Sequence, residues 1–206
     1  MKPLMIDLEK KTVIIFGGGG VGARKAAFFC READVRVLSR SFVPEFSGMN
    51  VECNEIDLSD LSDTTLLSLL KGAFLAVAAT QDENLNNRIG MCCRKAGILF
   101  NNAQGESGDL IIPSVIRGEH YILAISTEGA SPAISRYIRE FMEKSCPHLD
   151  DMISLQIRLR SFLKEHQPHV QRRKELIWEV LCDTDVWDAL SSGQQEAWDV
   201  IEARYL

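Results

Sequence analysis

The sequence has no excess of basic residues. Its 206 residues include 23 Lys and Arg against 29 Asp and Glu, and the formal net charge at pH 7 is −6. Proteins that bind nucleic acid through phosphate contacts usually carry more positive than negative charge. We therefore expect no nucleic-acid partner.

Residues 1–11 contain no long apolar run. They carry acidic and lysine side chains, whereas a signal peptide or a membrane span requires a continuous hydrophobic stretch. We expect a soluble, cytoplasmic protein without a membrane partner.

The six cysteines lack the spacing of a metal site or a redox motif. No Cys-x-x-Cys occurs among them, and none is spaced from a histidine as in the usual zinc patterns. We expect no bound metal, and reduced thiols that are mostly buried. The cysteines are Cys30, Cys53, Cys92, Cys93, Cys146 and Cys182.

The composition is that of an ordinary globular protein. Hydrophobic residues make up 46% and charged residues 25% of the chain, which excludes a disordered tail or a fibrous repeat. A chain of this length buries about 70% of its extended surface and forms a core without crosslinks. The length suits one full domain with an appendage.

Alternating strands and helices predict an α/β fold for residues 1–112. A glycine-rich turn separates the first strand from the first helix, and the apolar run at 73–79 is typical of a central parallel strand. This order predicts a Rossmann-like, doubly wound parallel sheet. The predicted strands are 12–16, 35–38, 51–56, 73–79 and 98–100, and the predicted helices are 23–32, 61–71 and 82–96.

The pattern changes after Asn101. Residues 110–112 and 121–126 read as two strands of a hairpin, with a turn near Gly118. Ser131 and Pro132 then begin a helix with an apolar stripe, which either packs on the main domain or forms a dimer interface. We divide the chain into a cofactor domain (1–112), a dimerisation segment (113–145) and a helical C-terminal domain (146–206).

The glycine turn fits the dinucleotide-binding pattern G-x-G-x-x-G. Gly17 permits the tight turn, Gly19 lets the backbone approach a pyrophosphate, and Gly22 lets the helix pack closely on the strand. Free N–H groups at the start of the helix would hold the diphosphate. We therefore expect a dinucleotide cofactor.

The end of the second strand lacks the acidic residue that many NAD sites carry. Arg40 and Ser41 stand there, and an arginine at this point favours the 2′-phosphate of NADP. The same arginine can also stack on adenine or be solvated. The residues by themselves lean slightly toward NADP.

Five segments together resemble the precorrin-2 dehydrogenase domain of siroheme synthases. The stretch STEGASP within the last of them is the most specific, because it does not belong to dinucleotide-binding folds in general. The resemblance covers about the first 145 residues, and the helical tail agrees in kind. The segments are GGGGVGARKA (17–26), RVLSRSFVPEF (36–46), AVAATQDENLNNRI (76–89), IIPSVIRG (111–118) and AISTEGASPAISRYIRE (124–140).

The resemblance implies NAD-dependent oxidation of precorrin-2 to sirohydrochlorin, combined in some members with iron insertion. It also implies a homodimer formed through the middle segment, and NAD as the cofactor in spite of Arg40. Carried over by position, the residues that contact the cofactor are Gly20, Val21, Arg40 and Ser41, with Thr80 near the nicotinamide.

The sequence departs from the family at one position. The family usually has an aspartate in the loop after the strand that ends in Asn, whereas here Gln104 or Ala103 occupies that position. Neither side chain ionises, so a base or metal ligand is missing unless Glu106 or Asp109 replaces it. Thr127 stands where the family has a serine, and it is either a residue of the substrate cavity or a turn residue before Gly129.

The substrate implied by the resemblance carries eight carboxylates, which require basic partners in a protein of negative net charge. We expect Arg117, His120, Arg136 and Arg139 to bind it, together with Asn101. Gln104 and Thr127 are the candidates for the catalytic position. Two alternatives stay open: a module that senses NAD without catalysis, and a chelatase with vestigial cofactor binding.

Overall fold

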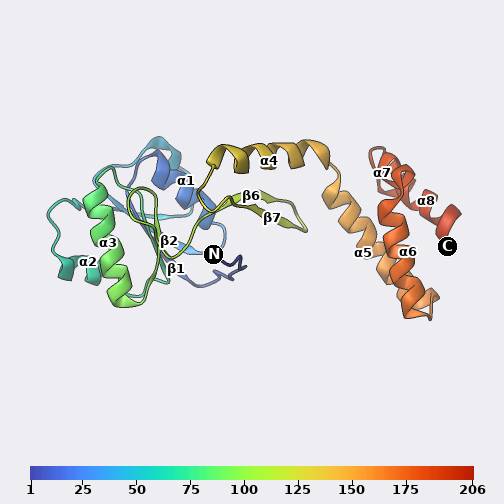
Figure 1. Ribbon diagram of the computed structural model, residues 1–206, viewed down its shortest axis with the longest axis horizontal. Helices are drawn as coiled ribbons and strands as arrows, with labels where there is room; N and C mark the ends of the chain where they lie inside the picture. Colours follow the sequence, from blue (N-terminus) through green and yellow to red (C-terminus); the bar gives the residue numbers. More distant parts are fainter. The chain divides into compact units, whose positions relative to one another are not determined.

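Five parallel strands in the order β3-β2-β1-β4-β5 form the sheet of the first part of the chain. The computed structural model describes residues 1–206 and divides them into two units, Met1–Ile112 and Pro113–Leu206 (Figure 1). The predicted parallel α/β sheet is confirmed. Its strands are β1 (Thr12–Phe16), β2 (Asp34–Ser39), β3 (Glu52–Glu55), β4 (Leu75–Ala78) and β5 (Leu99–Asn102).

Burial along the strands explains their order. All four residues of β4 are buried, as are four of the five residues of β1, and these two strands pair at the centre of the sheet. In contrast, β3 is polar and mostly exposed, as an edge strand can be. β-branched and aliphatic residues favour the buried central strands.

Helices cover both faces of this sheet. Alternate side chains of β1 point to opposite faces: Ile14 packs in a cluster with Leu66 and Ile89, while Ile15 packs in a second cluster with Ala26. The two clusters make the sheet doubly wound. The helices are α1 (Gly20–Phe29), α2 (Asp63–Leu69) and α3 (Glu83–Ala96), with a short 3₁₀ turn, η1 (Pro44–Phe46).

The segment after β5 covers the free edge of the sheet. The N–H groups of Asp109 and Leu110 donate to the carbonyl oxygen of Phe100 at 2.8 and 3.3 Å, and Leu110 packs against the core of the first unit. The prediction that residues 110–112 form a hairpin strand was therefore wrong. The side chains of Leu110 and Ile112 complete the core of the first unit, and edge coverage of this kind protects unpaired strand groups.

The second unit begins with the hairpin of β6 (Ser114–Arg117) and β7 (Ile122–Ile125), which pair antiparallel. Its turn is tied to a helix, because the carboxylate of Asp150 accepts hydrogen bonds from the N–H groups of Glu119 and His120, both at 2.9 Å. A side chain at Gly118 would collide with this carboxylate.

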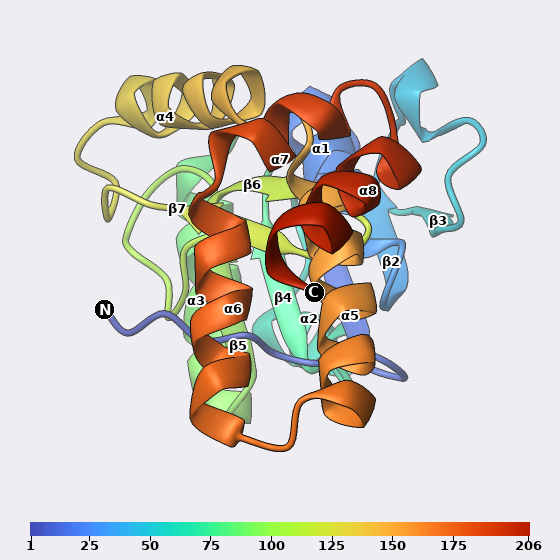
Figure 2. The same cartoon turned by 90° about the vertical axis from the view of Figure 1, so that its right-hand side faces the viewer.

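Five helices follow the hairpin, and the last four share one core. Leu155 and Leu159 pack with Val180 and Trp198 in this core. Figure 2 shows α5 and α6 lying alongside each other. The helices are α4 (Pro132–Ser145), α5 (Leu149–His166), α6 (Val170–Cys182), α7 (Thr184–Leu190) and α8 (Gln194–Tyr205). No helix of the protein has both the length and the hydropathy of a membrane span.

The cysteines are all free, and the expectation that most are buried was wrong. Only Cys92 and Cys93 are buried, both in α3, while Cys53 and Cys182 are exposed. Burial, with help from the neighbouring Cys92 and from Asp109, raises the pKa of Cys93 to about 12. This thiol therefore stays protonated at neutral pH and acts as a small core residue.

Candidate functional site

The glycine turn joins β1 to α1 at the carboxyl edge of the sheet. Gly17 has a φ of +120°, and a Cβ at this residue would lie 2.4 Å from the carbonyl oxygen of Ala79. A Cβ at Gly22 would lie 1.9 Å from the carbonyl oxygen of Gly17. Both positions therefore require glycine, one for its conformation and contact with the end of β4 and the other for close packing.

The start of α1 is open and uncapped. Its N-cap residue is Gly19, no side chain caps the helix, and its first turn holds no acidic residue. Nothing lies within 4 Å of where a Cβ of Gly19 or Gly20 would stand. The first N–H groups of a helix have no partner within the helix. This part of the chain therefore fits the diphosphate of a dinucleotide.

The end of β2 closes one side of this turn. The N–H of Val43 donates to the carbonyl oxygen of Gly18 at 3.0 Å, which holds residues 39–43 against the glycines. Arg40 and Ser41 are exposed. Asp57, just beyond β3, lies within electrostatic range of Arg40. An acidic side chain therefore does lie near Arg40, although it follows β3 and not β2.

The loops after β4 and β5 lie on the other side of the turn and are joined by α3. Thr80 follows β4, and its hydroxyl lies 2.7 Å from Oδ1 of Asn86. The Nδ2 of Asn86 donates to the carbonyl oxygen of Gln104 at 3.3 Å. The side chain of Asn86 therefore forms hydrogen bonds to both loops, the one that carries Thr80 and the one that carries Gln104.

The loop after β5 is held by asparagines. The Oδ1 of Asn87 accepts from the Nδ2 of Asn102 at 3.2 Å and from the N–H of Glu106 at 3.0 Å. Gln104 and Ala103, the two candidates for the position of the aspartate expected from the resemblance, are both exposed at this loop, and neither side chain ionises. Glu106 and Asp109 are both exposed, and the carboxylate of Asp109 accepts a hydrogen bond from the N–H of Phe100 at 3.1 Å.

Asn101 is an interior residue of β5. It is 6% exposed, and its Nδ2 donates to the carbonyl oxygen of Leu110 at 3.0 Å. Its Oδ1 is buried without a hydrogen-bond partner. The side chain thus supports the covering segment at the sheet edge, and its predicted contact with substrate stays a prediction.

The other predicted site residues belong to the second unit. The Oγ1 of Thr127 accepts from the N–H of Ser131 and donates to its carbonyl oxygen, both at 3.0 Å, which fits the reading as a turn residue. Arg136 pairs with Glu140 at 2.7 Å and Arg139 with Glu143 at 2.9 Å, each along one face of α4. Arg117 and His120 are exposed at the hairpin turn.

Comparison with known proteins places this geometry in a family. The profile of a family described as "Putative NAD(P)-binding" matches residues 4–114, the part that holds the glycine turn. A precorrin-2 dehydrogenase from Methanosarcina barkeri is 40% identical over 200 residues, which cover 95% of this chain and 89% of that protein. The chain belongs to the precorrin-2 dehydrogenase family.

Two further proteins show how much of the chain the similarity covers. A solved structure titled "SirC, precorrin-2 dehydrogenase" has the same fold over 98% of this chain and all of that chain, with a TM-score of 0.72 and 23% identity. A siroheme synthase from Baumannia cicadellinicola is 28% identical over 197 residues, but the match covers only 42% of that longer protein. The match to the Methanosarcina barkeri dehydrogenase thus spans most of both chains, whereas the match to the siroheme synthase spans less than half of that protein.

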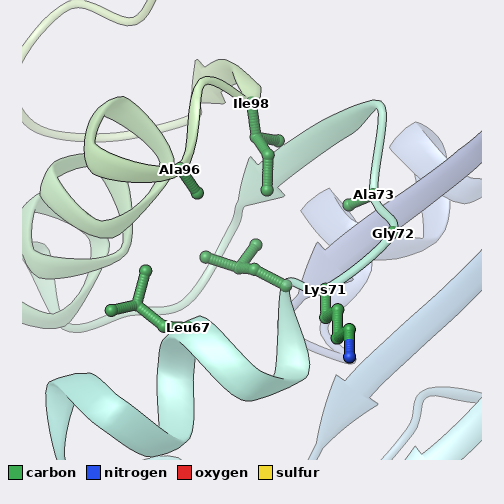
Figure 3. Close-up of a pocket in the computed structure, with 7 residues that line it drawn as sticks. Leu67, Lys71, Gly72, Ala73, Ala96 and Ile98 are labelled. Atoms are coloured by element: carbon green, nitrogen blue, oxygen red, sulfur yellow. The ribbon is translucent and has the colours of Figure 1, made fainter.

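The arrangement of possible metal ligands bears on the chelatase alternative. No group of three or more His, Cys, Asp or Glu side chains is arranged to hold a metal ion. A hollow of about 350 Å³ lies away from the cofactor turn, among Leu67, Lys71, Ala96 and Ile98 (Figure 3). These residues end α2 and α3 and precede β4 and β5, so the hollow is at the opposite edge of the sheet.

Sequence reasoning missed Asn86 and Asp57. Asn86 lies beside the apolar positions Leu85 and Ile89 in α3, and an amide among such positions was the available signal of a buried polar role. No sequence signal could have paired Asp57 with Arg40, because their proximity depends on the pairing of β2 with β3.

Proposed function

We propose that this protein oxidises precorrin-2 to sirohydrochlorin with NAD as the hydride acceptor. The observation that carries the proposal is the uncapped start of α1, which faces open space at Gly19 and Gly20, in a chain whose family relatives are precorrin-2 dehydrogenases. When bound, NAD would supply the acceptor for one hydride, and the substrate would release one proton in the same oxidation. A cytoplasmic location agrees with six free cysteines.

The residues of the first unit would act mainly by positioning. The N–H groups at the start of α1 would hold the diphosphate, and the Thr80 and Gln104 loops would flank the nicotinamide half beyond β4. Gln104 cannot take up the proton, so the proton would leave to water or to a carboxylate of the substrate itself. Correct placement of the reacting atoms can by itself supply a large part of the rate.

Asp57 supports NAD over NADP. The chain after Ser39 runs beside the chain after Glu55, since these residues are paired in the sheet and the N–H of Ile56 donates to the carbonyl oxygen of Ser39 at 2.9 Å. Hydrogen bonds from Ser59 fix the Asp57 carboxylate at 3.0 and 2.7 Å. These bonds first, and then the charge of Arg40, lower the pKa of Asp57. A 2′-phosphate drawn to Arg40 would therefore meet a fixed negative charge.

The charge of Asp57 can be removed without changing its shape. We expect Asp57→Asn to raise kcat/KM with NADP by about tenfold relative to NAD, because one nearby repulsion is lost. Asp60→Asn is the matched control, an exposed carboxylate in the same turn region, and it should leave the ratio unchanged. An unchanged ratio in Asp57→Asn would show that its charge does not reach the ribose.

A homodimer is proposed through the segment 113–145. The stripe of α4 is exposed, with Tyr137 at 64% and Phe141 at 55%, and the two rings stack on each other with centroids 6.4 Å apart. Ile134 and Ile138 continue it. Ser135 is the buried residue of this helix, so the apolar side is not the side that packs within the chain. A second copy would cover a face of this kind.

The substrate contacts stay proposals as well. Arg136 and Arg139 would bind substrate carboxylates together with Arg117 and His120, and Thr127 would line the same cavity. Arg136 and Arg139 now pair with Glu140 and Glu143 at the protein surface. Surface ion pairs of this kind are weak enough for a carboxylate of the substrate to replace the glutamate.

One assay distinguishes the three functional hypotheses, which are a dehydrogenase, a chelatase and a module that senses NAD. The protein is mixed with precorrin-2 and NAD, the absorbance of NADH and sirohydrochlorin is followed, and Fe²⁺ or Co²⁺ is then added. Turnover without metal supports the dehydrogenase, metal insertion alone supports a chelatase, and NAD binding without either supports a sensing module. Gln104→Asp should raise metal insertion and leave NADH formation unchanged if the missing aspartate matters only for chelation.

A further inference from the structure

Asn86 lies beneath the loops that follow β4 and β5, and it is completely buried. Its Oδ1 accepts hydrogen bonds from the N–H and from the hydroxyl of Thr80, at 3.2 and 2.7 Å. Its Nδ2 donates to two carbonyl oxygens, that of Thr80 at 3.1 Å and that of Gln104 at 3.3 Å. One side chain therefore connects the end of β4 to the end of β5.

The partners of this amide determine its orientation. A backbone N–H only donates and a carbonyl oxygen only accepts, so Oδ1 must face the N–H of Thr80 and Nδ2 must face the two carbonyl oxygens. Both hydrogens of the amide are used, and its oxygen accepts twice. An ionised carboxylate has no hydrogen to donate, and an aliphatic side chain neither donates nor accepts.

We propose that Asn86 is a positioning residue for hydride transfer, because it holds the Thr80 and Gln104 loops at the separation at which they flank the nicotinamide half of the cofactor. Being fully buried below these loops, it acts through them and not by contact. The inference rests on the proposed function, since that function places the nicotinamide beyond β4. The glycine turn and the end of β2 would hold the other half of the cofactor, and the Asn86 side chain makes its hydrogen bonds to Thr80 and Gln104 and to neither of these segments.

Asn84 provides a matched control in the first turn of α3. It is exposed, and its side chain makes no hydrogen bond to the loops after β4 and β5. The change Asn84→Asp therefore removes no bond that holds either loop. The same chemical change at Asn86 removes both donated bonds and turns a carboxylate toward two carbonyl oxygens.

The experiment compares two ligands and one rate in the full-length protein. ADP-ribose reports the diphosphate and adenosine half of the site, and NADH adds the nicotinamide. We expect Asn86→Asp to leave the Kd of ADP-ribose unchanged, to abolish the extra affinity of NADH over ADP-ribose, and to lower kcat with precorrin-2 by about 100-fold. Asn84→Asp should stay within about twofold of the parent protein in all three measurements.

A pH profile adds a readout that a purely structural role would not move. A buried carboxyl group facing two carbonyl oxygens takes up a proton more readily than one in water, and the protonated form can donate one hydrogen bond again. The kcat of Asn86→Asp should therefore rise, relative to the parent protein, as the pH is lowered from about 8 to about 6.

Three results would overturn the inference. One is an unchanged kcat in Asn86→Asp, and another is an equal loss of affinity for ADP-ribose and NADH, which would mean that Asn86 supports the whole site. The third is failure to fold, in both Asn86→Asp and Asn86→Ala, since the residue would then hold the domain and not two loops. If the parent protein does not oxidise precorrin-2 at all, the proposed function fails, and the comparison of NADH with ADP-ribose still tests Asn86 separately.

Discussion

Gly22 and Gly20, two glycines at the start of α1, should respond differently to replacement by alanine. In Gly22→Ala the new Cβ would lie 1.9 Å from the carbonyl oxygen of Gly17, and the two atoms must move about 1.1 Å apart to reach even 3.0 Å. Both residues are buried, so the start of α1 has to shift away from β1. In Gly20→Ala nothing lies within 4 Å of the new atom.

The expected magnitudes follow from these contacts. Overpacking of the Gly22 kind costs about 1–3 kcal/mol, which lowers the Tm of a unit of this size by about 4–12 °C. A displacement of about 1 Å at the diphosphate weakens function by about 100-fold. Gly20→Ala should keep or slightly raise the Tm, since alanine favours a helix by about 0.5–1 kcal/mol over glycine, but its methyl group should occupy part of the diphosphate position and weaken NAD binding.

Calorimetric titration with NAD and thermal unfolding of both variants test this reasoning. The signature is a loss of stability and affinity in Gly22→Ala against a loss of affinity alone in Gly20→Ala. If Gly20→Ala bound NAD as tightly as the parent protein, the open space at the start of α1 would not be the diphosphate site. An unchanged Tm in Gly22→Ala would contradict the close packing of α1 on the turn.

Three further predictions concern the second unit. The hydrogen bonds from the N–H groups of His120 and Glu119 lower the pKa of Asp150. The carboxylate therefore stabilises the fold above its ordinary pKa, and this contribution is lost as the pH falls below about 4. In an acid titration followed by circular dichroism, the stability of Asp150→Ala should depend less on pH in that range than the stability of the parent protein, and an identical dependence would count against the role of this carboxylate. Neutralising Arg136 together with Arg139 should weaken tetrapyrrole binding while NAD binding holds, as measured by fluorescence quenching; equal loss of both would indicate misfolding. Replacing Tyr137 and Phe141 together by glutamate should give a monomer in light scattering with unchanged circular dichroism, and a persistent dimer would place the interface elsewhere.

The glycine turn and the central strands could be predicted because their signals are local. An apolar run such as 73–79 indicates a buried strand by itself, and the spacing of Gly17, Gly19 and Gly22 between a strand and a helix indicates a dinucleotide turn. The prediction for residues 110–112 was wrong because their packing partner is not determined by a local signal. An apolar segment predicts burial, but the sequence does not say whether it is buried in a hairpin or along the edge of β5.

The parallel α/β fold, the dinucleotide turn and the likeness to the precorrin-2 dehydrogenase family could thus be predicted, because each depends on residues that are close along the chain. The distant residues that support the turn could be identified only in the folded protein. Asp57 comes near Arg40 because β3 pairs with β2, and Asn86 reaches Gln104 because α3 packs beneath the ends of β4 and β5. Hydrogen bonds act over about 3 Å in space, and only the folded chain brings such partners within that distance.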